Sequence, residues 1–168
     1  MRAGEGLLDR SAERLVVVGF RCWMAGYEYD SIACWEVAWN TYASELGATD
    51  ARRAFSGLQY WVRSVRQATH RTIRCFPHCC GRVCRDECMA LSLVSALQED
   101  NNDLARTATY YLTETPQSDQ ISSVTDAAGE FASALLAVGR RLIPVTTTIV
   151  ESIANYHAEP LVDRRAAH

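Results

Sequence analysis

At 168 residues, the chain is long enough for one domain and too short to require a second. Apolar residues make up 48% of it, so a hydrophobic core can form without a structural metal ion or a disulfide framework. No stretch supplies the roughly 20 uninterrupted apolar residues of a membrane-spanning helix, and no apolar signal core follows the first residues. We therefore expect a cytoplasmic protein without a membrane segment, folded as a single domain over residues 1–168, with flexible ends at 1–10 and 158–168.

The apolar residues recur with the period of an α-helix, and no segment alternates with the period of a half-buried strand. We predict an all-α, single-domain bundle of six to seven helices without significant β-sheet. The first helix is expected over residues 11–24, ending near Gly26. The second has Asp30 or Ser31 as its N-cap and Gly47 just past its end.

A third, long helix is expected to begin at Thr49 or Asp50. One of its sides is apolar and the other is basic. Four residues follow the basic side at helical spacing, and they are the candidate residues for binding an anion or a partner: Arg63, Arg66, His70 and Arg74.

Pro77 cannot lie inside that helix without breaking it, so residues 75–78 are expected to form a corner. A fourth helix then begins near His78 or Cys79. Because it is apolar nearly all round over residues 89–97, we place it at the centre of the bundle.

The second half of the chain predicts a polar turn at 99–103, a short fifth helix over 104–112 and a linker at 113–120. A sixth helix follows over 121–142, and Pro144 kinks it or ends it before a last helix, which gives a C-terminal helical hairpin. The apolar stripe of the sixth helix is close to a heptad seam, which could pack within the monomer or across a homodimer. We expect a homodimer.

The charge is unevenly distributed along the chain. All seventeen basic residues are arginines, and eight of them lie between Ala51 and Arg85, where there is no Asp or Glu. Nine arginines remain against all twenty acidic residues elsewhere. This asymmetry predicts an acidic protein partner for one face, or self-association between oppositely charged faces. A further alternative is pairing of the arginines with carboxylates of other helices, for which the candidates are Asp86, Glu87, Glu36 and Glu45. An isoelectric point of about 5.8 and the lack of a helix-turn-helix pattern argue against nucleic acid as the partner.

Cysteine is concentrated in the same region. Zinc and iron sites use thiolate and imidazole ligands, but the C-x2-C knuckles of zinc ribbons are absent. If the fourth helix begins at Cys79, then Cys80 and Cys88 lie about 12 Å apart along its axis, too far to share one ion. A zinc or iron site would therefore combine one neighbouring pair with ligands from the corner or from another helix, where Cys22 and Cys34 are available. The six candidates within the region itself are Cys75, His78, Cys79, Cys80, Cys84 and Cys88.

Two other interpretations of the cysteines stay open. Cys79 and Cys80 are adjacent, and the arginines around them would favour the reactive thiolate form, as in a thiol-based redox or sensor protein. Cysteine is also among the most frequently buried residue types, so the whole set could simply pack in the core.

No phosphate-binding loop, dinucleotide fingerprint, nucleophile elbow or His-Glu-x-x-His helix is present. We therefore predict a non-enzymatic binding or regulatory protein, with a metal site at the Cys75–Cys88 corner. The first alternative is the thiol-based protein. The second is an interaction module with an arginine-rich face and purely structural cysteines.

Overall fold

The computed structural model describes residues 6–156. Within this range the chain forms seven α-helices, one 3-10 helix and no strand, which confirms the predicted all-α bundle. None of these helices is both long and apolar enough to cross a membrane. In chain order the elements are η1 (Leu7–Asp9), α1 (Ser11–Glu28), α2 (Ile32–Leu46), α3 (Ala48–Ala68), α4 (Arg85–Gln98), α5 (Asn102–Thr113), α6 (Ser118–Ala137) and α7 (Thr147–Ala154).

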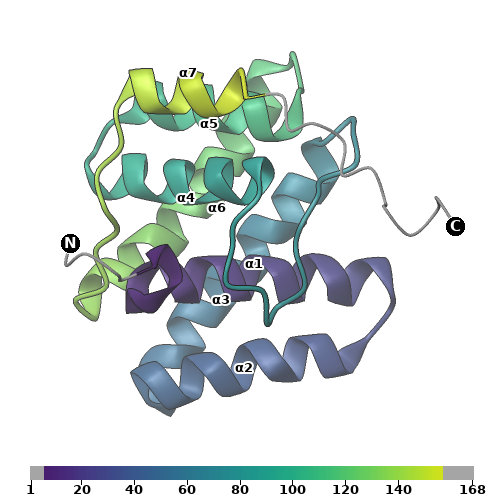
Figure 1. The fold of residues 1–168 in the computed structure, drawn as a ribbon, viewed down its shortest axis with the longest axis vertical. Helices are drawn as coiled ribbons and strands as arrows, with labels where there is room; N and C mark the ends of the chain where they lie inside the picture. Colours follow the sequence, from purple (N-terminus) through teal and green to yellow (C-terminus); the bar gives the residue numbers. More distant parts are fainter. Residues whose placement is uncertain (1–5, 157–168) are drawn as a thin grey trace, which may run out of the picture.

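The helices pack around one core. In Figure 1, α1 lies between α2 and α4, while α7 lies at the top against α4 and α5. Helices α3 and α6 run diagonally across the back and make the most extensive contact in the bundle. They can approach closely because Gly57 of α3 has no side chain; a Cβ atom there would lie 2.9 Å from the Cα atom of Phe131.

Aromatic side chains fill the centre of the core. Trp61 is fully buried and stacks on Phe131 of α6, with 5.5 Å between the ring centroids, while Phe20 of α1 packs beside it at 5.2 Å. Tyr42 of α2 is also fully buried, and its hydroxyl donates to the Leu15 carbonyl at 2.7 Å. These contacts join the first three helices to one another and to α6, which is distant in sequence.

The first two helices largely follow the prediction. Ser31 and Gly47 flank α2 as expected, and Gly47 has a φ of 78°, a conformation that favours glycine. The predicted end of the first helix near Gly26 is wrong, because α1 continues to Glu28. Gly26 instead permits close packing, since a Cβ there would lie 2.2 Å from the indole nitrogen of Trp35.

The largest correction concerns residues 69–84, which form neither helix nor strand. Helix α3 begins at Ala48 and ends at Ala68, so His70 and Arg74 do not continue its basic side. The next helix begins at Arg85, so Cys80 and Cys84 do not share a helical face with Cys88. The physical reason is that the side chains of Arg21, Asp86 and Glu87 bind backbone C=O and N–H groups of this segment, in place of helical hydrogen bonds.

In the second half, α5 agrees with the prediction, and residues 114–117 alone separate it from α6. Helix α6 ends at Ala137, earlier than predicted, and Gly139 with a φ of 74° follows that end. Residues 138–146 then lead to α7. Of the ends that were expected to be flexible, residues 1–5 and 158–168 lie outside the described range, and Leu7–Asp9 form η1.

Candidate functional site

Residues 69–84, which we call the cysteine loop, leave the end of α3, pass in front of α1 and return to α4 (Figure 1). Arg21 of α1 lies beneath this loop and is 1% exposed. Its guanidinium donates to the carbonyl of Cys80 at 2.7 Å and to the carbonyl of Arg82. A buried cation therefore binds backbone acceptors that have no helical or sheet partner.

The same guanidinium forms an ion pair with Glu87. Nε donates to Oε1 at 2.6 Å and Nη2 donates to Oε2 at 2.9 Å, so the pair is bidentate. Glu87 also accepts the backbone N–H groups of Phe76 at 2.8 Å and Cys84 at 2.9 Å. Burial alone would lower the pKa of Arg21, but the hydrogen bonds and negative charge of Glu87 outweigh it and raise that pKa above its ordinary value.

Asp86, which precedes Glu87 in the sequence, binds the part of the cysteine loop that follows α3. Its two carboxylate oxygens accept from both terminal nitrogens of Arg71, at 2.5 and 3.0 Å, and one also accepts the N–H of Arg74 at 2.8 Å. Both carboxylates lie in the first turn of α4, where the helix dipole favours negative charge. Two consecutive acidic residues thus hold the cysteine loop on both sides of its far end: Asp86 binds residues 71 and 74, and Glu87 binds residues 76 and 84.

The cysteines fall into two groups. Burial raises the pKa of Cys84 and of Cys88 to about 11, and raises the pKa of Cys75 well above the ordinary value of 9.0. The Cys84 thiol also donates to the carbonyl of Arg74 at 3.1 Å. By contrast, Cys79 is exposed and Cys80 is half-buried, near the far end of the loop. Three of the five clustered cysteines are therefore at least half-buried thiols with a raised pKa.

The loop does not gather the six candidate metal ligands into one site. Among residues 6–156, no group of three or more His, Cys, Asp or Glu side chains lies close enough together to hold a metal ion. His78 and Cys79 are both exposed, whereas Cys75, Cys84 and Cys88 are each at least half-buried. The zinc or iron site stays a prediction.

Four exposed arginines of α3, Arg52, Arg53, Arg63 and Arg66, form what we call the arginine face. None of them makes an ion pair with any residue between 6 and 156. The guanidinium of Arg66 lies over the ring of Tyr27, 4.2 Å from its centroid. Of the four residues predicted to share one side, Arg63 and Arg66 do so. His70 and Arg74 are exposed but belong to the cysteine loop.

Sequence reasoning missed the role of Arg21. Nothing in the sequence distinguishes this arginine of α1 from the exposed ones. The partners of some other arginines were predictable, because Asp86 and Glu87 are the first acidic residues after the basic segment. Both do pair with arginines, and Glu45 pairs with Arg14 at 2.7 Å, whereas Glu36 makes no ion pair among residues 6–156.

Comparisons of the chain with protein-family models, with curated proteins and with solved structures find no match.

Proposed function

We propose that this protein is a non-enzymatic interaction module whose arginine face binds an acidic surface of a partner protein. The observation that carries the proposal is the contrast between two sets of arginines from one basic segment. Arg71 and Arg85 bond to Asp86 within the fold. The four arginines of the arginine face make no ion pair within the described residues and remain exposed.

The spacing of these arginines suits an extended acidic surface. Arg52, Arg63 and Arg66 lie within about 60° of one another around the helix axis, and they span roughly 21 Å along it at 1.5 Å per residue. Tyr60, which is 66% exposed, lies one turn before Arg63 and adds apolar area to the same side. The contact with Tyr27 restrains Arg66 before binding, which lowers the entropy cost of association.

The half-buried thiols of Cys75 and Cys84 fit this proposal as structural groups. Cys75 packs against the hydrophobic core, and Cys84 is the N-cap residue of α4. Since their raised pKa values keep them protonated near neutral pH, they are poor nucleophiles and poor metal ligands unless a metal displaces the protons. The predicted zinc or iron site is the alternative to this proposal, and the metal content of the variant Cys84→Ser tests it.

A second candidate function is thiol-based sensing at Cys79 and Cys80. The observation in its favour is exposure: all seven cysteines lie in the described range, and Cys79 alone among them is exposed. Time-resolved alkylation at neutral pH tests this function. Rapid labelling of Cys79 or Cys80 relative to a model thiol peptide would support it, and labelling no faster than the peptide would contradict it.

The arginine face can be tested with poly-L-glutamate as the probe, with binding followed by fluorescence anisotropy at 50 to 300 mM NaCl. We expect Arg63→Glu to weaken binding at least tenfold. The matched variant Arg141→Glu makes the same change in net charge at an exposed site away from α3 and should weaken binding less than twofold. Binding should also fall as salt rises.

Two outcomes would contradict the proposal. An equal loss for Arg63→Glu and Arg141→Glu would mean that net charge alone attracts the probe. Binding that does not depend on salt would remove the electrostatic basis. Sedimentation of the unmodified protein at low and high salt, measured in parallel, tests the predicted homodimer, because association through oppositely charged faces should weaken at high salt.

A further inference from the structure

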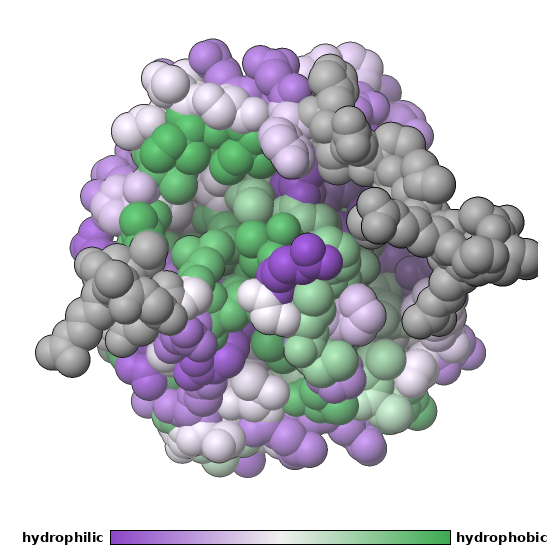
Figure 2. Space-filling view, in the orientation of Figure 1, coloured by the Kyte–Doolittle hydropathy of each residue, from purple (hydrophilic) through white to green (hydrophobic). Residues whose placement is uncertain are grey.

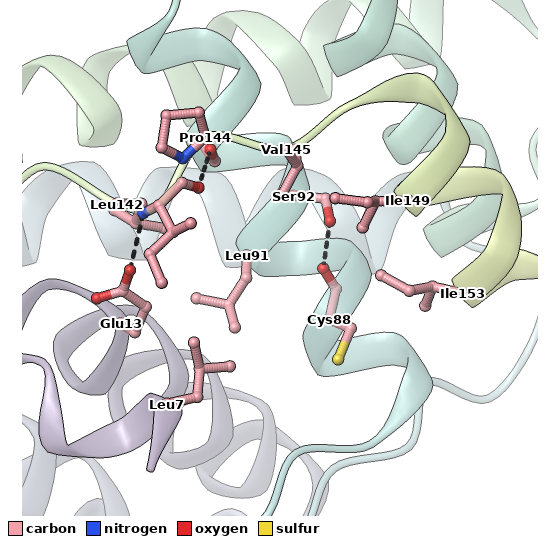
Figure 3. Close-up of a pocket in the computed structure, with 12 residues that line it drawn as sticks. Leu7, Glu13, Cys88, Leu91, Ser92, Leu142, Pro144, Val145, Ile149 and Ile153 are labelled. Atoms are coloured by element: carbon pink, nitrogen blue, oxygen red, sulfur yellow. Dashed lines mark hydrogen bonds between the residues drawn. The ribbon is translucent and has the colours of Figure 1, made fainter. Parts of the chain in front are cut away.

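A hollow of about 230 Å³, which we call the apolar pocket, lies between α4, α7 and η1 (Figure 3). Leu91 of α4 lies at its centre, with Leu7 of η1 on one side and Ile153 of α7 on the other. The connector before α7 contributes Pro144 and Val145 to the wall. Figure 2 shows apolar side chains, in green, gathered on this face beneath α7. The pocket is on different elements from the arginine face and the far end of the cysteine loop.

The polar groups in the wall already bond to one another. The Glu13 carboxylate accepts the N–H of Ile143 at 2.8 Å, and the Ser95 hydroxyl donates to the carbonyl of the same residue at 2.7 Å. The Ser92 hydroxyl donates to the Cys88 carbonyl at 2.7 Å. The Cys88 thiol is neutral because burial raises its pKa to about 11. Among the described residues that line the pocket, a ligand therefore meets mainly carbon and one neutral sulfur, and no free side-chain donor for a charged group.

The size of the pocket decides what can enter it. An apolar cavity of about 150 Å³ takes up benzene, so by proportion about 230 Å³ holds a molecule of about nine non-hydrogen atoms. An α-helix with its side chains is about 10–12 Å across and is too wide. At the mouth, Ile143 is 38% and Ile149 is 45% exposed, so a ligand there would cover apolar area that now faces water.

We propose that the apolar pocket binds a small, neutral, hydrocarbon-rich molecule of about the size of 1-octanol or naphthalene. Burial of the ligand and of the two isoleucines at the mouth drives binding. The pocket selects against anions, because a ligand carboxylate would lose its water contacts on entry without gaining a free donor; the Glu13 carboxylate in the wall is already bonded to the N–H of Ile143 and to Arg10, at 3.0 Å. The expected affinity is modest, since so few atoms contribute.

The test uses 1-octanol and octanoate as probes and the alkylation rate of Cys88 as the readout. Cys88 lines the pocket, so bound 1-octanol should slow its alkylation at least fivefold in a saturable manner. Cys79 is exposed in the cysteine loop and provides the internal control, with an unchanged rate. Octanoate should need at least a tenfold higher concentration for the same protection.

Matched variants locate the binding. Ile149→Glu places a charge at the mouth and should abolish the protection of Cys88. Ile32→Glu introduces the same change at another exposed isoleucine, on α2, and should leave the protection intact. If circular dichroism shows that Ile149→Glu disturbs the fold, Ile149→Ala replaces it, with an expected loss of protection of at least threefold.

Three results would overturn the proposal. Cys88 could be alkylated at the same rate at every 1-octanol concentration. Protection could persist unchanged in the Ile149 variant that retains the fold. Alternatively, the unmodified protein could sediment as a dimer that Ile149→Glu converts to a monomer while 1-octanol protects nothing. The pocket would then receive a side chain from a second copy.

Discussion

Arg21 and Glu87 are separated by 66 positions in the sequence, and their side chains form a bidentate ion pair in which neither is more than 1% exposed. This pair connects α1 to α4 and, through the remaining hydrogen bonds of both groups, to the cysteine loop. A buried pair of this kind gains its attraction at a large desolvation cost. The contribution of this ion pair to the stability of the fold therefore depends on both charges being present.

Removing one charge of the pair should destabilise the protein strongly. In Glu87→Gln, the Arg21 guanidinium stays buried without a counter-charge, and we expect the free energy of unfolding to fall by about 3–5 kcal/mol. Urea denaturation measures this change. Glu99→Gln is the control, because it breaks the exposed pair with Arg141 and should cost less than about 1 kcal/mol. An equal loss of unfolding free energy in the two variants would contradict the claim that the buried pair matters more than the exposed one.

The variant Cys84→Ser shows whether Cys84 has a structural role or binds a metal ion. Serine is a favoured N-cap residue, and its hydroxyl can keep the hydrogen bond to the Arg74 carbonyl. If Cys84 is structural, the free energy of unfolding should stay the same or rise by up to about 1 kcal/mol. If Cys84 binds zinc or iron, metal content and melting temperature should fall together. Elemental analysis by mass spectrometry and a thermal melt distinguish the two.

Stability should decline in alkaline solution. Burial raises the pKa of Cys22 from 9.0 to about 11, and the neighbouring Cys34 adds to the rise. The folded state therefore holds the Cys22 proton more tightly than the unfolded state between pH 9 and about 11. The stability linked to this proton is complete below pH 9 and is lost as pH rises toward 11.

Cys22→Ala tests this linkage. Because the substitution leaves a small cavity, it should lower stability at every pH, but it should also reduce the alkaline decline by about 2–3 kcal/mol. Urea denaturation at a series of pH values from about 8 to 11 gives the slope of the free energy of unfolding against pH for the variant and for the unmodified protein. If the slopes of the variant and the unmodified protein are the same, Cys22 is not among the groups responsible.

Two glycines in helices should respond to alanine in opposite directions. At Gly57 a Cβ atom would lie 2.9 Å from the Cα of Phe131, so Gly57→Ala must push α3 away from α6 and should cost about 1–3 kcal/mol. At Gly129 of α6 no atom lies within 4 Å, and Gly129→Ala should stabilise by about 0.4–1 kcal/mol. Thermal melts and urea denaturation of both variants give the sign of the change in the free energy of unfolding. A stabilising Gly57→Ala would contradict the close helix contact.

Helix positions were predictable where apolar periodicity and a terminal residue agreed. Helix α2 is the clearest case, because Ser31 and Gly47 lie at its two ends and its apolar residues repeat at helical spacing between them. Gly26 misled the prediction for a physical reason: glycine serves both to end a helix and to admit a neighbouring side chain. Only the position of the Trp35 ring distinguishes these two uses.

The cysteine loop was not predictable, because long-range polar contacts stabilise its backbone. Apolar periodicity carries no information about a guanidinium that binds the carbonyls of Cys80 and Arg82 from another helix. The concentration of arginines in one segment was visible in the sequence. Which arginines are buried in ion pairs and which remain exposed depends on tertiary packing. The arginine face could therefore be predicted only in part, through Arg63 and Arg66.

The two amide hydrogens bound by Glu87, those of Phe76 and Cys84, lie in a segment without regular secondary structure. Such segments usually exchange their amide hydrogens with solvent deuterium early, through small local openings. Here exchange requires the release of a carboxylate that is 0% exposed and paired with Arg21. These two amides should consequently exchange on the timescale of the core helices, which makes part of an irregular loop as slow to open as the interior of the protein.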